Sequence, residues 1–176
     1  MRRRGIGTQV VHGQVTRGVE LTSLHEDLVR SGKKATTKLL SVATIKATKK
    51  DAEHLGVAAG DDILWIRRIR YADGVAVSIM ENWLPTDFTD ITVEDLAQNG
   101  LYQILRTRGV SLRVAKQRIG ARKANPEEAK LLEIEKGSAL LTMDRTAYDN
   151  SGRAIEYGHH CYRPDLYSFE VTLVEK

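Results

Sequence analysis

The sequence predicts an α+β domain in which a mainly antiparallel sheet is flanked by short helices and is built from two similar halves. An internal repeat is the first reason, because a shift of 77 positions lays Gly60 on Gly137 and Arg68 on Arg145. The second reason is a strong hairpin turn, Asp73-Gly74, between two β-prone runs. Expected strands also outnumber expected helices. Two copies are too few for a solenoid, so we expect the halves to complete one sheet.

The first half of the chain alternates between helical and extended patterns. Apolar residues at helical spacing predict a helix over 21–31, with Thr22 or Ser23 as N-cap and Gly32 after its end. Gln14 to Glu20 has no apolar period and is expected to be a linker. The elements expected next are a strand over 38–48, a short helix over 49–55 and a hairpin of strands 63–72 and 75–84.

The second half repeats this order after a helical interlude. Pro126 predicts a helix start, and the turn Asn150-Ser151-Gly152 matches the first hairpin turn. The expected elements are short helices over 93–97 and 101–107, a strand over 112–121, the helix from Pro126, a hairpin of 140–148 and 154–162, and a last strand over 169–174.

The composition limits the class of protein. A chain of 176 residues with 41% hydrophobic and 28% charged residues suits one globular domain with a real core. Its apolar runs are too short to span a membrane, and no apolar stretch follows Met1 to Arg4 as a secretory signal would require. The single cysteine, Cys161, excludes an internal disulfide and fits a cytoplasmic location. A net charge of +4 permits nucleic-acid binding without establishing it.

Two interpretations are open for the start of the chain. Residues 2–11 are rich in arginine, then punctuated by glycine, then β-prone. A disordered basic tail is the plainer explanation. The alternative is the last strand of a DNA-binding wing, in which Arg3 and Arg4 lie along phosphates.

Strand alternation groups polar residues on shared faces of the predicted strands. Arg68 and Arg70 share a face of one strand, Asn82 shares a face with Ser78 and Met80 on the strand paired with it, and Glu156 and Tyr162 share a face of the last hairpin. Two neighbouring guanidiniums repel unless an anion lies between them, and their donor forks fit phosphate or carboxylate. Solvated arginines on an open face are the alternative.

No pattern predicts catalysis, a cofactor or a metal. His159 and Cys161 flank His160, but adjacent strand residues face opposite ways and no second ligand cluster exists in the sequence. There is neither a phosphate-binding glycine loop before a helix nor a serine elbow. We therefore expect no catalytic residue, no cofactor and no metal.

With these pieces placed, the chain resembles the UTRA domain, the effector-binding module of the HutC subfamily of GntR-type bacterial transcription regulators. The resemblance covers about Leu21 to Val174 and depends on the order and spacing of several segments. These segments are 21–28, Arg68 to Gly74, Asn82 to Pro85, Gly100 to Leu105, Asp149 to Glu156 and Tyr162 to Tyr167.

The resemblance implies a chorismate-lyase-like fold and a domain division. The family places a winged helix-turn-helix before the effector domain, and residues 2–11 resemble only its final wing strand. We therefore expect residues 1–20 to be a remnant of the DNA-binding wing plus linker, and residues 21–176 to be the effector-binding domain.

The resemblance also implies site residues. In sugar-phosphate-sensing members the arginines of an R-x-R strand hold the anionic group, and these match Arg68 and Arg70. Three positions depart from the family pattern: a serine hydroxyl is lost at Gly100, an acidic residue becomes Met80, and a helix-start threonine becomes His25. The departures argue for an anionic metabolite other than a simple copy of the family's sugar phosphates. The predicted ligand-binding residues are Arg68, Arg70, Tyr102, Glu156, Tyr162, His25 and Asn82.

The leading functional prediction is a ligand-sensing regulatory domain without enzymatic activity. A small anionic metabolite, such as a phosphorylated sugar or a carboxylate, would act allosterically on a homodimer. Operator DNA would be reached only through the missing winged helix domain, and no membrane is involved. The alternatives are a chorismate-lyase-like enzyme acting on a small anionic substrate and a plain dimerisation domain without a ligand.

Overall fold

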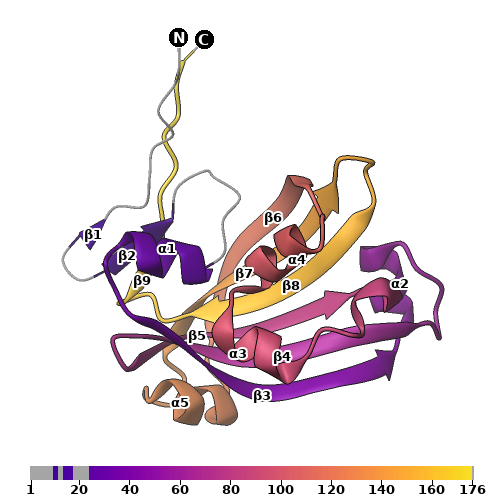
Figure 1. The fold of residues 1–176 in the computed structure, drawn as a ribbon. Coiled ribbons are helices and arrows are strands. Elements are labelled where there is room, and N and C mark those ends of the chain that lie inside the picture. The colour runs from indigo at the N-terminus through magenta and orange to yellow at the C-terminus, as the bar shows by residue number, and fades with distance from the viewer. Residues whose placement is uncertain (1–9, 12–13, 18–23, 176) are drawn as a thin grey trace.

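The computed structural model describes residues 10–11, 14–17 and 24–175, and its centre is one six-stranded antiparallel sheet (Figure 1). The strand order is β3-β4-β5-β8-β7-β6. These strands are β3 (Ala35–Lys46), β4 (Asp62–Ala72), β5 (Val75–Leu84), β8 (Ala154–Tyr162), β7 (Ala139–Asp149) and β6 (Leu112–Lys123).

Short helices cover both faces of this sheet. On one face lie α1 (Leu24–Arg30), α3 (Val93–Gln98) and α4 (Leu101–Thr107), with the 3-10 turn η1 (Thr86–Phe88) before them. On the other face lie α2 (Lys49–Leu55), which packs on β8, and α5 (Pro126–Leu132), which packs on β5. A small second sheet joins β1 (Val10–Val11), β2 (Gln14–Arg17) and β9 (Tyr167–Phe169).

Both predicted halves are present, and their elements correspond in position along the chain. β3 and β6, α2 and α5, and β4 and β7 begin and end at positions separated by the same 77 residues. Even the helix caps correspond, since Thr48 and Asn125 each close a capping box with the third helical residue. The strand order is the same when read outward from β5 and β8, so the halves meet at the middle of the sheet. The predicted fold class is confirmed.

Four predicted elements differ from the structure. Gln14–Arg17 forms strand β2 instead of a linker, because its backbone pairs in parallel with Tyr167–Phe169. The strand expected over 169–174 is wrong: regular pairing ends at Phe169, and Leu173 beyond it is 89% exposed with no sheet to pack on. The strand expected over 38–48 ends at Lys46, because Thr48 instead caps α2. The first helix begins at Leu24, and its expected cap residues lie outside the described residues.

The core is divided by the sheet. The α3–α4 side buries aliphatic residues such as Leu64, Leu96 and Leu105, whereas α5 packs Leu132 against Ile69 and Ile79. Within the described part of the chain, no helix is long and apolar enough to cross a membrane. The polar residues that interrupt this core lie mainly between β4 and α4.

Candidate functional site

Two arginines enter the interior from neighbouring positions of β4. Arg68 lies opposite Met80 and Arg70 opposite Ser78 in the register with β5, so both point to the face that α4 covers. Each is only 2% exposed. The predicted shared face is therefore present, and the solvated alternative does not hold.

A chain of hydrogen bonds runs from Arg68 across the site. Arg68 Nη2 donates to Asn82 Oδ1 at 2.9 Å, and Asn82 Nδ2 donates to Glu156 Oε1 at 2.6 Å. The phenol of Tyr102 on α4 donates to the other oxygen, Glu156 Oε2, at 3.1 Å. Arg145 Nη1 on β7 donates to the Tyr102 oxygen at 3.1 Å. Three predicted residues thus form one connected network with Arg68.

The arginine end of this network carries unused hydrogen-bonding capacity. Among the described residues, Arg68 Nε and Nη1 are buried without a hydrogen-bond partner. Burial lowers the pKa of Arg68 to about 10, against the opposing charge of Glu156. Burial, and then the positive charge of Arg68, lower the pKa of Arg70 to about 9, while its Nη1 donates to Thr37 Oγ1. A buried pair of cations in this state favours an anion.

The carboxylate end has the opposite character. Glu156 is 1% exposed, and burial raises its pKa. The hydrogen bond from Asn82 and the charge of Arg145 act against that rise. The site therefore combines a cationic end with a hydrogen-bond acceptor end.

The space inside the site is small. The cavity has a volume of about 20 Å³, close to the volume that holds one water molecule. Any larger ligand requires the helices that cover it to move. The lining residues are Leu24, Arg68, Arg70, Met80, Asn82, Leu101, Tyr102, Arg145 and His160.

Two of the predicted ligand residues whose side chains the structure describes, Glu156 and Tyr162, do not line this cavity. Glu156 reaches it through Asn82 and Tyr102. Tyr162 is fully buried behind the lining residue His160. Its hydroxyl lies 2.9 Å from His160 Nδ1, and its ring stacks on Tyr167 with 4.4 Å between the centroids. The backbone of His25 belongs to α1, but its side chain lies outside the described part of the structure. The predicted DNA contacts Arg3 and Arg4 also lie outside the described residues.

Two site residues were missed by the sequence prediction. Arg145 is the counterpart of Arg68 in the repeat, so the repeat itself contained the signal. Gly158 faces Asn82 across β5 and β8, and an added Cβ would lie 2.6 Å from Glu156 Oε1 and 3.0 Å from His160 Nε2. This glycine keeps the centre of the polar network clear of a side chain.

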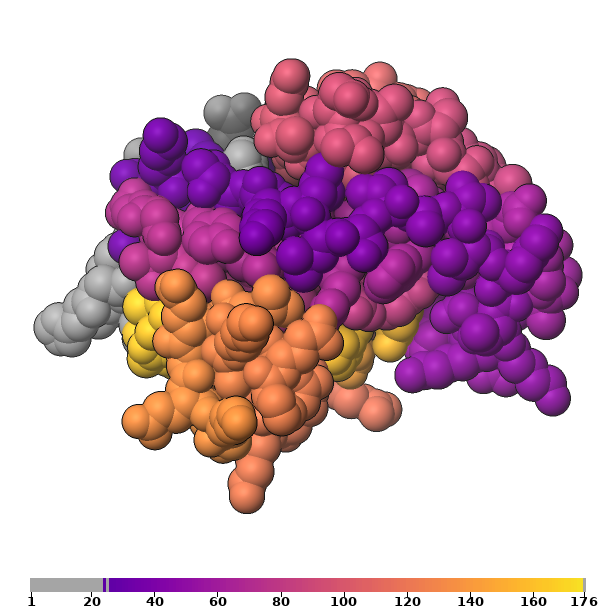
Figure 2. All heavy atoms as spheres, turned by 90° about the horizontal axis from the view of Figure 1, so that it is seen from below, coloured from indigo at the N-terminus to yellow at the C-terminus, as the bar shows by residue number. Residues whose placement is uncertain are grey.

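A much larger cleft, about 810 Å³, lies on the opposite face of the sheet. Figure 2 shows this face hollowed between the orange lobe that includes α5 and the violet lobe that includes α2. Trp83 and Tyr157 are among its lining residues, and none of the predicted ligand residues is. The smaller cavity, in contrast, is lined by the buried Arg68 and Arg70, and Glu156 is connected to it through Asn82 and Tyr102.

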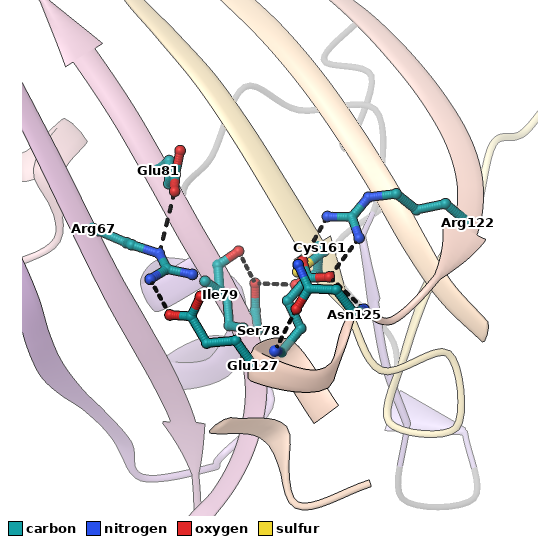
Figure 3. Close-up of polar contacts among 9 residues, drawn as sticks. Arg67, Ser78, Ile79, Glu81, Arg122, Asn125, Glu127 and Cys161 are labelled. Carbon is teal, nitrogen blue, oxygen red and sulfur yellow. Dashed lines mark hydrogen bonds and ion pairs between the residues drawn. The ribbon is translucent and has the colours of Figure 1, made fainter. Parts of the chain in front are cut away.

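Arg67 marks the difference between the two faces. It lies between Glu81 and Glu127, with nitrogen–oxygen distances of 3.2 and 2.7 Å (Figure 3). Its charge is therefore satisfied, unlike that of Arg68. Among the described residues no group of three or more metal-ligating side chains occurs.

A two-halved antiparallel sheet with a covered polar site on one face defines a small-molecule-binding domain. Residues 30–168 match the UTRA domain, and the chain belongs to this family. It is 32% identical to the HTH-type transcriptional regulator GgaR of Escherichia coli K12 over 169 residues, which cover 96% of this chain and 67% of that protein. It is 31% identical to the HTH-type transcriptional repressor NagR of Bacillus subtilis over 170 residues, which cover 96% and 70%.

A solved structure agrees with this assignment at the level of the fold. The effector domain of PhnF from Mycobacterium smegmatis superposes with a TM-score of 0.83 at 24% identity, covering 91% of this chain and 99% of that one. The relatives are GntR-type transcriptional regulators rather than enzymes. The chain is thus a ligand-binding regulatory domain of a GntR/HutC-type regulator, and the chorismate-lyase-like alternative is not favoured.

Proposed function

We propose that the domain binds a small anionic metabolite in the cavity between β4 and α4, with Arg68 and Arg70 holding the anionic group. The unused donors Nε and Nη1 of Arg68 are the observation that carries this proposal. An anion placed there satisfies the donors and screens the repulsion between the two guanidiniums. Each charge-assisted hydrogen bond contributes about 1.5–3 kcal/mol. A phosphorylated sugar and a carboxylate both fit this fork.

The acceptor end of the network supports a second contact with the same molecule. Glu156 and Asn82 are placed to hydrogen-bond hydroxyl or amino groups of the polar remainder, together with Tyr102. Tyr162 and His25 complete the proposed set of ligand residues. The effector would therefore carry hydrogen-bond donors as well as negative charge.

The proposed mechanism is allosteric. Because the cavity holds about 20 Å³, effector entry displaces the covering segments that contribute Leu24, Leu101 and Tyr102. In a homodimer, a ligand that prefers one arrangement of these helices favours one spacing of two DNA-binding heads on a palindromic operator. Operator DNA would be contacted through a winged helix-turn-helix preceding residue 21, with Arg3 and Arg4 along phosphates, in the cytoplasm.

The test begins with native mass spectrometry of the purified chain, which identifies a retained metabolite by its mass. Calorimetric titration of that metabolite then compares the wild type with Arg70→Ala. We expect the variant to bind roughly tenfold to a hundredfold more weakly, using about 1.4 kcal/mol per decade of affinity.

Two further variants sharpen the titration. Arg67→Ala, on the opposite face, should leave affinity almost unchanged. Arg70→Lys should rescue binding only in part, because an ammonium lacks the planar fork. Equal losses at Arg67 and Arg70, or no loss at either, would overturn the assignment.

Dimer formation and DNA binding are tested separately. Analytical sedimentation should show a species of twice 19.7 kDa at micromolar concentration, and a monomer alone would contradict the dimer. The chain itself should show no sequence-selective gel shift at physiological salt, because side chains must reach base edges for specific recognition.

A further inference from the structure

Arg145 is the repeat counterpart of Arg68, yet its surroundings differ. It is 5% exposed and lies on the same face of the sheet. Its Nε and Nη2 donate to Gln117 Oε1 at 3.1 and 2.8 Å, and its Nη1 donates to Tyr102. Each of its three nitrogens therefore donates to a protein group, whereas Nε and Nη1 of Arg68 do not.

The contacts of Arg145 instead converge on Tyr102. Its guanidinium carbon lies 5.7 Å from the centroid of the Tyr102 ring, in addition to the hydrogen bond to the phenol oxygen. A phenol has one proton, and in Tyr102 that proton is donated to Glu156 Oε2. The hydroxyl is thus held between a donor on β7 and an acceptor on β8.

We infer that Arg145 is a positioning residue of the effector site: it holds Tyr102 against Glu156 and keeps Glu156 a charged hydrogen-bond acceptor. The ligand part of this inference rests on the proposed function, whereas the internal contacts stand without it. The consequence for recognition is chemical. A charged Glu156 accepts from hydroxyl or amino groups of an effector, whereas a protonated one would present its own donor to them.

The groups that face Glu156 from the surrounding elements support this role. They are Arg68 on β4, Asn82 on β5, Tyr102 on α4, Arg145 on β7 and His160 on β8, whose Nε2 lies 3.3 Å from Asn82 Nδ2. Burial raises the pKa of Glu156. Two positive charges oppose this rise, and Arg145 has a larger effect than Arg68. Removing the charge of Arg145 therefore favours the protonated form.

The test is a pH titration of the Glu156 side-chain carboxyl by carbon-13 NMR in the ligand-free chain, with the signal assigned by Glu156→Gln. Arg145→Gln should raise the titration midpoint by about one pH unit or more. Arg145→Lys retains the charge and should stay close to the wild type. Arg118→Gln removes an exposed arginine from β6 and is the matched control, with no expected shift.

A folded Arg145→Gln variant whose midpoint equals that of the wild type would overturn the inference, and so would an equal shift in Arg118→Gln. Tyr102→Phe is the second variant if Arg145→Gln does not fold. It leaves both charges in place and should raise the midpoint by a smaller amount, because one hydrogen bond to the carboxylate is lost. An unchanged midpoint in Tyr102→Phe would contradict the proposed series of contacts from Arg145 through Tyr102 to Glu156. These measurements need no effector, so they are independent of failure at Arg68 and Arg70.

Discussion

The two halves of the repeat share a backbone but use it differently beneath their helices. Under α5, Leu132 packs into an aliphatic cluster with Ile69 and Ile79. Under α2, Leu55 packs with Tyr157, whose ring stacks on His54 at 3.8 Å beside the open cleft of about 810 Å³. Capping, turns and alternation therefore specify the half-domain, while the side chains between helix and sheet are free to diverge.

Arg68 and its repeat counterpart Arg145, on the other face of the sheet, also differ in their side-chain contacts. Arg68 retains two nitrogens without a hydrogen-bond partner, whereas each nitrogen of its counterpart Arg145 donates to Gln117 or Tyr102. One position in the repeat is thus available to a ligand, and the other is committed to the architecture of the site.

The largest effect is expected from truncating the corresponding helix leucines. Leu132→Ala should lower the free energy of unfolding by about 4 kcal/mol, because the tightly packed aliphatic cluster is left with a cavity. Leu55→Ala should cost about 2 kcal/mol, because its neighbours border an open cleft and can relax. Urea unfolding of the two variants measures the difference. Equal losses would show that the two helix interfaces are equivalent after all.

An intermediate effect is expected at the third residue of each helix. Glu128 on α5 is 5% exposed and accepts from both Arg122 terminal nitrogens at 2.6 Å, whereas Asp51 on α2 serves the exposed capping box alone. Glu128→Gln should cost about 2 kcal/mol at pH 7, and Asp51→Asn about 1 kcal/mol or less.

The contribution of Glu128 should also depend on pH. The hydrogen bonds from Arg122 lower the pKa of Glu128 in the folded state. Its stabilisation is therefore present above the unfolded value of about 4.3 and is lost as pH falls through the lower folded value. Urea unfolding below about pH 4 should show wild type and Glu128→Gln converging. A gap that stays constant down to pH 2 would contradict this assignment.

The smallest effect concerns the residues that end α2 and α5. Gly56 and Glu133 occupy the same left-handed cap, with φ of 62° and 56°. Glu133→Gly should stabilise the protein by at most about 1 kcal/mol, because relief of backbone strain exceeds the entropy cost of glycine. Gly56→Ala should destabilise it by about 1 kcal/mol, since nothing crowds that position and only conformation matters. Melting curves that move in the same direction would show that the caps are not equivalent.

Local patterns predicted most of the fold because the repeat presented each pattern twice. The hairpins, the helix from Pro126 and the pairing of halves follow from turn residues and periodicity. The strand at Gln14–Arg17 did not, because it depends on a partner more than a hundred residues away. The alternation of Phe169, Val171 and Leu173 misled for the same reason: a strand needs a neighbour, and none is present beside 170–175 among the described residues.

Site residues were predictable where alternation along a strand determines which face a side chain occupies. They were not predictable where their role depends on the order of strands in the sheet. Arg68, Arg70 and Asn82 follow from two paired strands. The repeat marks Arg145 as the counterpart of Arg68, but its contact with Tyr102 depends on the strand order, and recognising Gly158 requires knowing which atoms approach it. Neither the strand order nor the surroundings of Gly158 is encoded in a local sequence pattern.

The alkylation rate of Cys161 should report how often β8 becomes exposed. The residue is 2% exposed near the C-terminal end of β8, and burial raises the pKa of its thiol to about 12. Because alkylation needs the exposed thiolate, the reaction should wait for exposure of the strand. It is the only cysteine in the chain, so one modification reports one event. A metabolite that binds the folded domain slows that event in proportion to its occupancy, so the alkylation rate can be used to search for the effector.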